Sequence, residues 1–368
     1  MTAYIPWVLV FLTIIQLLYW LLVFSRLAFH KKTTPAPQKI ENKVSIVICA
    51  KDEAENLKKF LPRILNQSYR ILEIIVVDDH SCDTTANTLR QFKKKYNNLH
   101  IVRTDKDADS FGKKYALAKG INAAKNDVLL LTDADCQPNS LNWTTKMQQY
   151  ITGNIEIGLG YAPYFTYPGF LNKFIRFETV YTAIQYFSFT LVGMPYMGVG
   201  RNLIYKKSLF NEAGGFSEHM NIKSGDDDLF INQVANKSNT SIILDKDTFV
   251  YSVPKKSFSA YYKQKSRHLT TGTKYTLIQK LILGLLSFSH FFFYFFLTLS
   301  LILQISIIFA VTLYVIRMGL ILLIIKPILK TLEEKSLLVW IPILDFAFVF
   351  FYIIFLPNLF FRKKTTWK

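Results

Sequence analysis

Two aspartates, Asp133 and Asp135, stand one residue apart just after an apolar run at residues 129–131. The run predicts a strand that is buried on both faces of a sheet, and Pro138 marks its end. In open α/β sheets, ligands bind at the carboxyl edge of the strands, which is where this pair falls. Carboxylate oxygens suit Mg²⁺ or Mn²⁺, and such an ion would carry a diphosphate. A solvated acidic turn is the more frequent origin of so short a pattern, so the other strand ends decide between the two interpretations.

The two strands predicted earlier in the chain also end in acidic side chains. Apolar runs at residues 44–50 and 71–77 predict these strands, and a segment typical of a helix follows each of them. The acids that follow the strands are Asp52, Glu53, Asp78 and Asp79. Because parallel strands end at the same edge of their sheet, three acidic ends indicate a pocket there.

The alternation of strands and helices predicts right-handed crossover connections and a mostly parallel α/β sheet. Helices are expected at residues 54–65, 84–96 and 112–120, the last with a glycine at each end. Further strands are expected at residues 99–103, 157–167, 241–244 and 248–253, and further helices at 171–191 and 261–268.

The charge and composition of the chain favour a membrane over nucleic acid. The formal net charge is +18 over 368 residues, and 51% of the residues are hydrophobic. A basic surface suits an anionic membrane or phosphorylated substrates, and the sequence has no paired Cys/His zinc spacing and no aromatic nucleic-acid signature. The widely spaced Cys49, Cys82 and Cys136 indicate reduced thiols in a cytoplasmic compartment.

Apolar residues gather at the two ends of the chain. Residues 1–30 are expected to form an uncleaved transmembrane anchor, and residues 31–43 a short linker. Basic residues follow the anchor, so the positive-inside tendency places the next domain in the cytoplasm.

Residues 278–361 are expected to form a second membrane region of two to three spans. The apolar segments lie at about residues 281–303, 305–325 and 338–360. With the anchor, three such spans would leave the basic C-terminal tail outside, against the positive-inside tendency. One segment is therefore expected to be re-entrant or interfacial, and Pro342 and Asp345 point to the last.

Residues 44–270 resemble the catalytic domain of family 2 glycosyltransferases, which have the GT-A fold. The matching pieces keep the order and spacing of the family: residues 44–53, 74–84, 112–120, 133–135, and 214–216 with the acidic cluster after them. The piece V-D-D-x-S-x-D-x-T is the most specific of them. The resemblance implies a Rossmann-like, mostly parallel cytoplasmic domain flanked by transmembrane helices, in an integral protein of the bacterial cytoplasmic membrane.

The resemblance also implies roles for the acids at the strand ends. Asp52, Glu53 and Asp79 would line the nucleotide pocket and accept hydrogen bonds from base and ribose, and Asp78 would support that loop. Lys113 would balance the diphosphate charge. The two aspartates of the D-x-D motif would hold Mg²⁺ or Mn²⁺ on the diphosphate and so stabilise the leaving group. A capped turn is the alternative for Asp78 and Asp79, and a solvated helix lysine is the alternative for Lys113.

The acidic cluster at residues 225–229 would supply the general base. An inverting transfer needs a carboxylate that deprotonates the acceptor hydroxyl as it attacks opposite the departing nucleotide. The family reads Glu-Asp, a short spacer and Leu, whereas this chain reads Gly-Asp-Asp-Asp-Leu. Alignment on Gly225 favours Asp227 as the base and puts Asp226 at the position of the family's glutamate. Alignment on Leu229 favours Asp226. Asp227 is the expected base, and an acidic helix start favoured by the helix dipole is the alternative.

A third motif, at residues 264–268, resembles the Q-x-x-R-W motif of processive and lipid-modifying members. It reads Gln-Lys-Ser-Arg-His, so that His268 stands at the position of the family's tryptophan. The resemblance implies that Arg267 pairs with diphosphate and that Gln264 holds the acceptor. The change to histidine speaks against an aromatic stacking role and against a polymerase.

The chain is accordingly expected to be an inverting glycosyltransferase. It would move a sugar from a UDP- or GDP-linked donor to a lipid or lipid-linked acceptor, close to the membrane on its cytoplasmic face. The alternatives are a processive polysaccharide synthase and a non-catalytic membrane module that binds nucleotide.

Overall fold

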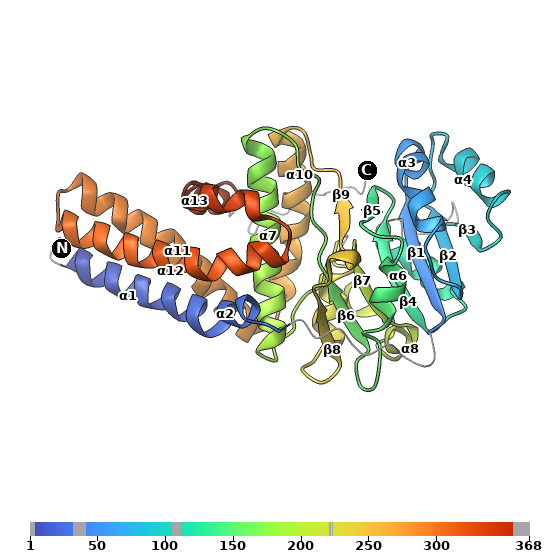
Figure 1. Ribbon diagram of the computed structural model, residues 1–368, viewed down its shortest axis with the longest axis horizontal. Helices are drawn as coiled ribbons and strands as arrows, with labels where there is room; N and C mark the ends of the chain where they lie inside the picture. The colour runs from blue at the N-terminus through green and yellow to red at the C-terminus, as the bar shows by residue number, and fades with distance from the viewer. Residues whose placement is uncertain (1–3, 32–41, 105–111, 221, 223, 356–368) are drawn as a thin grey trace.

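The structure, a computed structural model, describes residues 4–31, 42–104, 112–220, 222 and 224–355. Figure 1 shows an α/β part that holds the sheet and, beside it, long helices that project away from it. Two helices, α7 (Phe170–Leu191) and α10 (Phe258–His268), lie between these two parts. The expected linker at residues 31–43 lies almost entirely outside the described residues.

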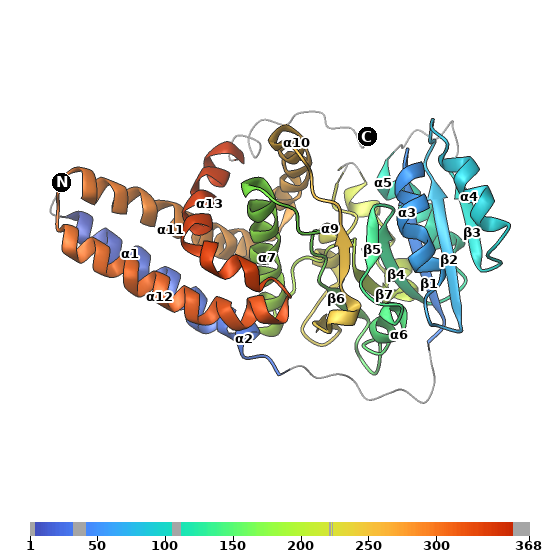
Figure 2. The ribbon, with the colours of Figure 1, turned by 45° about the horizontal axis from the view of Figure 1, so that its top comes forward.

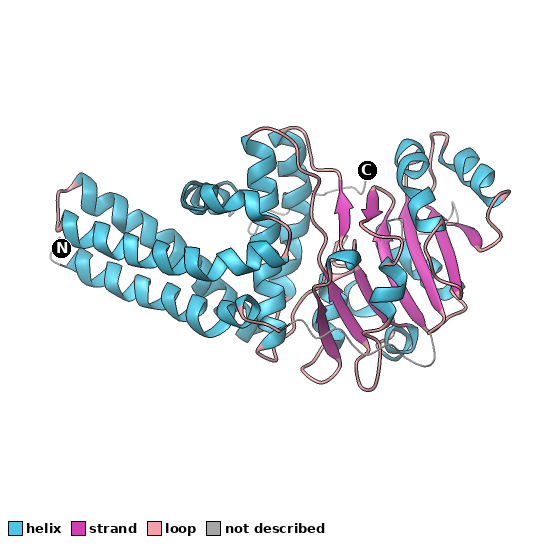
Figure 3. Ribbon diagram, in the orientation of Figure 1, coloured by secondary structure: helices cyan, strands magenta, loops and turns pink. Residues whose placement is uncertain are grey.

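The central sheet has seven strands in the order β3-β2-β1-β4-β7-β6-β8. The strands are β1 (Val44–Ala50), β2 (Leu72–Asp78), β3 (Leu99–Arg103), β4 (Val128–Asp133), β6 (Ile157–Gly160), β7 (Leu203–Lys206) and β8 (Thr240–Ile243). All neighbours pair in parallel except β7, which runs antiparallel to β4 and β6. The prediction of a mostly parallel α/β sheet is therefore confirmed, and Figure 3 shows how the strands gather in one part of the molecule.

Both faces of the sheet are covered, which explains the unbroken apolar strands. Alternate side chains point to opposite faces, so that Val47 and Val77 lie in one core cluster while Ile46 and Val76 lie in another. The helices of this part are α3 (Ala54–Leu65), α4 (Thr85–Lys93), α5 (Lys113–Ala123), α6 (Trp143–Gln148), α8 (Lys207–Glu212) and α9 (Asp228–Val234). Gly120 lets α5 approach the sheet, because a Cβ there would lie only 2.6 Å from a methyl group of Val47.

Three predicted elements were too long, one of them the strand expected at residues 248–253, which spans Val250–Ser252. Helix α4 ends at Lys93 instead of residue 96, where asparagines, which are poor helix formers, follow. The strand expected at residues 157–167 ends at Gly160. Pro163 has no N–H to donate to a ladder, and beyond it only an isolated bridge joins Tyr164 to Ser252. A separate two-stranded sheet forms beside the main one, from β5 (Cys136–Pro138) and β9 (Val250–Ser252).

Among the described residues, four helical segments are long and apolar enough to cross a membrane: Ile5–Ala28, Leu277–Ile302, Ile307–Thr331 and Lys335–Phe355. The first consists of α1 (Ile5–Leu18), a π-helical turn and α2 (Ser25–Ala28), and the next two are α11 and α12. The last begins as a 3₁₀ turn (Lys335–Trp340) and continues as α13 (Ile341–Phe355). Figures 1 and 2 show α1, α11 and α12 running alongside one another, whereas α13 is turned out of line with them.

A buried ionic cluster joins all four of these segments. Arg317 of α12 is fully buried and donates a hydrogen bond of 2.7 Å to Asp345 of α13. The same guanidinium donates to Gln16 of α1 at 3.3 Å. On α11, His290 lies 3.1 Å from Asp345, and the Tyr294 hydroxyl donates to this carboxylate at 2.6 Å. Because a buried charge is costly unless it is paired, the cluster constrains how the four segments pack.

Candidate active site

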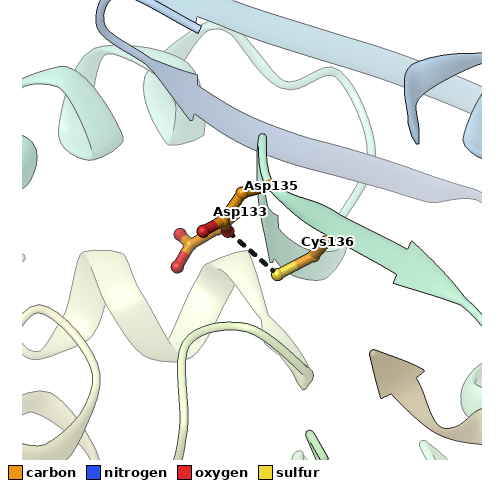
Figure 4. A group of neighbouring side chains, drawn as sticks. All are labelled: Asp133, Asp135 and Cys136. Atoms are coloured by element: carbon orange, nitrogen blue, oxygen red, sulfur yellow. Dashed lines mark hydrogen bonds between the residues drawn. The ribbon is translucent and has the colours of Figure 1, made fainter. Parts of the chain in front are cut away.

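The turn from β4 to β5 carries Asp133, Asp135 and Cys136, which Figure 4 shows together. Each offers one ligand atom, and these three atoms lie within 4.8 Å of one another. The Cys136 thiol donates a hydrogen bond of 3.4 Å to Asp135. Burial and the neighbouring Asp133 charge raise the pKa of Asp135. Two crowded carboxylates are oxygen ligands that fit Mg²⁺ or Mn²⁺, and such a cation would relieve this repulsion.

Lys113 connects this turn to the acidic cluster. It is the first residue of α5, after Gly112, whose φ of +135° a residue with a side chain rarely adopts. Its Nζ lies 3.1 Å from Asp133 Oδ1 and 2.9 Å from Asp226 Oδ2. Burial would lower the pKa of Lys113, but the Asp133 and Asp226 charges outweigh it and raise this pKa well above its ordinary value. The structure thus brings the D-x-D turn, Lys113 and the acidic cluster together in one site.

The three aspartates of the cluster have different surroundings. Asp227 caps α9, and its two carboxylate oxygens accept hydrogen bonds from the backbone N–H groups of Asp228 at 2.9 Å and Gly200 at 2.7 Å. Asp228 accepts from the Tyr275 hydroxyl at 3.2 Å. Asp226 is the one whose carboxylate meets Lys113.

The pKa shifts of the three aspartates separate them further. Burial would raise the pKa of Asp226, but the adjacent Lys113 charge holds it below its ordinary value. Burial and the Asp226 charge raise the pKa of Asp227, and burial and the Asp227 charge raise that of Asp228 to about 7. Asp226 is thus the member of the cluster whose pKa is lowered and whose carboxylate shares Lys113 with Asp133 of the D-x-D turn.

The acid most suited to meet a nucleotide is Asp79, at the end of β2. Its side chain is 1% exposed, and its Oδ1 accepts a hydrogen bond of 2.8 Å from the Thr104 hydroxyl. Its Oδ2 accepts no hydrogen bond from any described residue, and the Lys51 ammonium lies 3.9 Å away. A buried acceptor in this state is suited to an N–H or O–H donor from a ligand.

Among the other acids predicted to surround the nucleotide, Asp52 and Asp78 accept hydrogen bonds from backbone N–H groups of loops. Asp52, with a left-handed φ of +55°, accepts hydrogen bonds from the backbone N–H groups of Cys82 at 2.7 Å and Asp83 at 3.3 Å. It therefore ties the loop after β1 to the loop after β2. Asp78 is buried and accepts from the Ser81 N–H at 3.2 Å, which fits the expected loop-supporting role. Glu53 precedes α3 at the same edge and accepts a hydrogen bond from Asn56.

Helix α10 brings its motif toward the same pocket. Gln264 donates a hydrogen bond of 3.4 Å to the Tyr164 hydroxyl. Desolvation and the nearby positive charges, which include those of Lys113 and Arg201, lower the pKa of His268. Arg267 lies on the same helix, and its side chain has no ion pair or hydrogen bond within the described part of the chain.

Sequence reasoning assigned no role to three residues around the pocket. Cys136 adds a thiol beside the D-x-D carboxylates. Arg201 lies close enough to oppose the charge of Asp135. The buried Lys114 donates a hydrogen bond of 2.7 Å to the backbone oxygen of His219, just before the acidic cluster. Proximity to the D-x-D motif was the available signal for Cys136, whereas nothing in the sequence indicates which distant residues meet Arg201 and Lys114.

Comparison with known proteins agrees with this geometry. The family model described as "Glycosyl transferase family 2" matches residues 45–211, and the one described as "Glycosyl transferase family group 2" matches residues 152–359. The glycosyltransferase AglE of Haloferax volcanii is 31% identical over 191 residues, which are 50% of this chain and 58% of AglE. A dolichol-phosphate mannosyltransferase of Pyrococcus furiosus is 35% identical over 96 residues, 26% of each chain. The match thus spans little more than half of the first relative and a quarter of the second.

Among solved structures, the mannosyltransferase PcManGT from Pyrobaculum calidifontis, in complex with GDP-Man and Mn²⁺, superposes with a TM-score of 0.60 at 18% identity. The superposition covers 93% of this chain and 99% of that one. At this identity the likeness establishes the fold, helices included, while the second family model covers more than half of the chain. The chain belongs to glycosyltransferase family 2, and its α/β part has the GT-A fold.

Proposed function

We propose that this protein is an inverting, membrane-bound glycosyltransferase that transfers a sugar from a nucleotide-sugar donor to a lipid or lipid-linked acceptor. One observation carries the proposal: a single ammonium group, that of Lys113, lies between Asp133 of the D-x-D motif and Asp226 of the acidic cluster. The groups that would handle the leaving diphosphate and the acceptor proton are therefore adjacent, as a direct displacement requires.

The acceptor base in this proposal is Asp226 instead of Asp227. A base must be ionised and must reach the acceptor hydroxyl. Both oxygens of Asp227 are already engaged by backbone N–H groups, and the pKa of Asp227 is raised by burial and by the Asp226 charge. Within the described residues, the Asp226 carboxylate pairs with the Lys113 ammonium, which can turn to the diphosphate when a donor binds. The alignment on Leu229 gives the same assignment.

Asp133 and Asp135, with Cys136 beside them, would hold the divalent ion. When bound there, Mg²⁺ or Mn²⁺ supplies positive charge to the leaving diphosphate. Asp79 would accept a hydrogen bond from base or ribose through its Oδ2, which accepts none from the described residues, and Glu53 would lie beside it. A structural neighbour was solved with GDP-Man and Mn²⁺, which supports a nucleotide-linked donor such as a GDP-sugar and Mn²⁺ as one suitable ion.

The membrane topology that we propose has three crossings and one returning segment. Glu334, at the start of the last segment, pairs with Arg176 on α7, and at its end Phe355 stacks on Tyr262 of α10 with ring centroids 5.2 Å apart. Both ends therefore contact the helices next to the catalytic domain. Between them, Asp345 contacts His290.

The depth of that contact follows from helix length. His290 lies about 20 Å along α11 from Leu277, where the helix begins next to the catalytic domain, at 1.5 Å per residue. The segment Lys335–Phe355 therefore enters the bilayer and returns to the side from which it came. The basic residues that follow it in sequence would then be cytoplasmic, together with the catalytic domain, as the positive-inside tendency requires. A C-terminal reporter that is active only in the cytoplasm tests this, and a signal from a reporter active only outside would contradict it.

The test of the activity uses the full chain in detergent micelles, with a panel of UDP- and GDP-sugars and either Mg²⁺ or Mn²⁺. Release of the nucleoside diphosphate should depend on the metal, and NMR of the product should show an inverted anomeric centre. Asp226→Asn should reduce turnover by about 100-fold or more, and Asp227→Asn much less. Asp247→Asn, away from the pocket, is the matched control. Full activity in Asp226→Asn, or a retained anomeric centre, would contradict the proposal.

A further inference from the structure

Arg201 lies behind the metal-binding turn and makes three contacts there. Its Nη1 donates a hydrogen bond of 2.6 Å to the Ser252 hydroxyl, and its Nη2 donates one of 3.0 Å to the backbone oxygen of Ala162. The guanidinium also lies over the Tyr164 ring, 4.4 Å from its centroid. A planar cation held by two hydrogen bonds and one ring has a fixed orientation.

From Ser252 the contacts lead to the metal-binding turn. Strands β5 and β9 pair Cys136 with Ser252, and the Cys136 sulfur lies 3.0 Å from the Ser252 hydroxyl. Both side chains are buried, at 0% and 1% exposure. The Cys136 thiol in turn donates to Asp135 Oδ1 at 3.4 Å. Arg201 is thus connected to a D-x-D carboxylate through two buried side chains.

The role of this connection follows from the charges of Asp133, Asp135 and Arg201. Asp133 and Asp135 repel one another when both are ionised, and both must be ionised to hold a cation. Arg201 supplies an opposite charge close to Asp135 that does not depend on pH. Unlike the Lys113 ammonium, which contacts Asp133 directly, the Arg201 guanidinium directs its hydrogen bonds to Ser252 and Ala162. It can therefore orient Asp135 without taking a place that the metal needs.

The same chain of contacts reaches the helix at the membrane side. Gln264 of α10 donates a hydrogen bond of 3.4 Å to the hydroxyl of Tyr164, the residue on which Arg201 stacks. Tyr164 is also bridged to Ser252 through the backbone. A displacement of α10 would therefore change the contacts of Arg201 and Ser252 before it changes those of the carboxylates.

We propose that Arg201 is a positioning residue, which acts through Ser252 and Cys136 to hold Asp135 in the orientation that binds the divalent ion. Gln264 on α10 supports the same arrangement through Tyr164. The inference rests on the metal-binding role proposed for Asp133 and Asp135. It assigns part of the metal affinity to residues that do not touch the metal, and links that affinity to the helix next to the membrane.

The experiment measures Mn²⁺ binding to the purified full chain in detergent by titration with electron paramagnetic resonance, without donor or turnover. Arg201→Met and Ser252→Ala should each weaken Mn²⁺ binding by about 10-fold or more, as the loss of outer-shell partners does at other metal sites. Arg201→Lys should restore part of the affinity. Tyr164→Phe, which keeps the ring and loses the Gln264 contact, should have a smaller effect. Arg90→Met, at an exposed arginine of α4, is the control and should bind as the unaltered chain does.

Two outcomes would overturn the inference. One is unaltered Mn²⁺ affinity in Ser252→Ala, which is a small change at a buried site and keeps the test valid if Arg201→Met does not fold. The other is unaltered Mn²⁺ affinity in Arg201→Met together with weakened nucleoside diphosphate binding, which would make Arg201 a donor ligand. Asp135→Asn separates this inference from the proposed function, because unaltered Mn²⁺ affinity there would overturn the metal role of Asp135 itself.

Discussion

Asp133 and Asp226 share one ammonium group, since Lys113 Nζ lies 3.1 Å from the first carboxylate and 2.9 Å from the second. The two carboxylates come from a strand end and a helix start that are more than ninety residues apart in the sequence. Three charged groups in such contact behave as a unit, because removing one leaves the others unbalanced in a partly buried pocket. The pocket therefore depends on Lys113 as much as on either acid.

Replacement of Lys113 by methionine should reduce turnover by about 100-fold or more, because the like charges of Asp133 and Asp226 would lose their shared partner and the diphosphate would lose a cation. Lys113→Arg should retain part of the activity. Turnover of a nucleotide-sugar by the full chain is the measurement, and Lys263→Met, at an exposed lysine of α10, is the control. Unreduced activity in the methionine variant would show that the charge is not needed.

Acid should destabilise the protein through His219. Burial and the Lys114 charge lower the pKa of His219 from 6.5 to about 4. The unfolded chain therefore takes up a proton at higher pH than the folded chain, so the stability is complete above pH 6.5 and falls as the pH is lowered toward 4. At about 1.4 kcal/mol per pH unit, the loss has an upper limit of about 3 kcal/mol.

Thermal unfolding of the detergent-solubilised chain between pH 4 and pH 7 measures this loss. His219→Asn should flatten the pH dependence, whereas His100→Asn, at a more exposed histidine, should leave it as it is. A slope that is the same in both variants would assign the acid sensitivity to other groups.

The position of the site could be predicted from the sequence because parallel strands end at a common edge of their sheet. That logic placed Asp79, Asp133 and Asp135 correctly at one edge of the sheet. It could not tell Asp226 from Asp227, because a shift of one residue at a loop-helix junction changes which side chain caps the helix and which faces the pocket. In the structure the backbone N–H of Gly200 donates to Asp227, a contact between segments with no shared sequence pattern, and this contact supports the proposal of Asp226 as the base.

Two other features were beyond the sequence for similar reasons. Asp52 was predicted to line the nucleotide pocket, and nothing in the sequence indicated that its left-handed backbone also lets the carboxylate accept a hydrogen bond from the loop after β2. Arg201 stands in a glycine-rich loop and acquires its partner only because β9 pairs with β5. In both cases a long-range backbone arrangement, which local residue preferences do not encode, determines what the side chain meets.

The fit of α5 against the sheet should be sensitive to one methyl group. A Cβ at Gly120 would lie 2.6 Å from Val47 and 2.7 Å from Val77, both in the central strands. Gly120→Ala should therefore destabilise the protein by about 1–3 kcal/mol, despite the better helix propensity of alanine. Gly272→Ala is the control, because no atom lies within 4 Å of a Cβ built there. Thermal unfolding compares the two, and equal midpoints would contradict the tight packing at Gly120.

The Arg317–Asp345 pair should be the most costly single contact to break among the apolar helices. Asp345→Ala would leave a guanidinium that is 0% exposed without its main partner, at an expected cost of about 3–5 kcal/mol. The double variant Arg317→Met, Asp345→Leu should recover most of this loss, because well-packed apolar side chains replace buried ion pairs at little cost. Unfolding of the full chain in detergent measures both variants. Glu156→Ala breaks the surface pair with Lys206, whose atoms lie 3.5 Å apart, and should cost less than about 1 kcal/mol. If Asp345→Ala costs no more than Glu156→Ala, the returning segment Lys335–Phe355 is held by its apolar contacts and not by this ion pair.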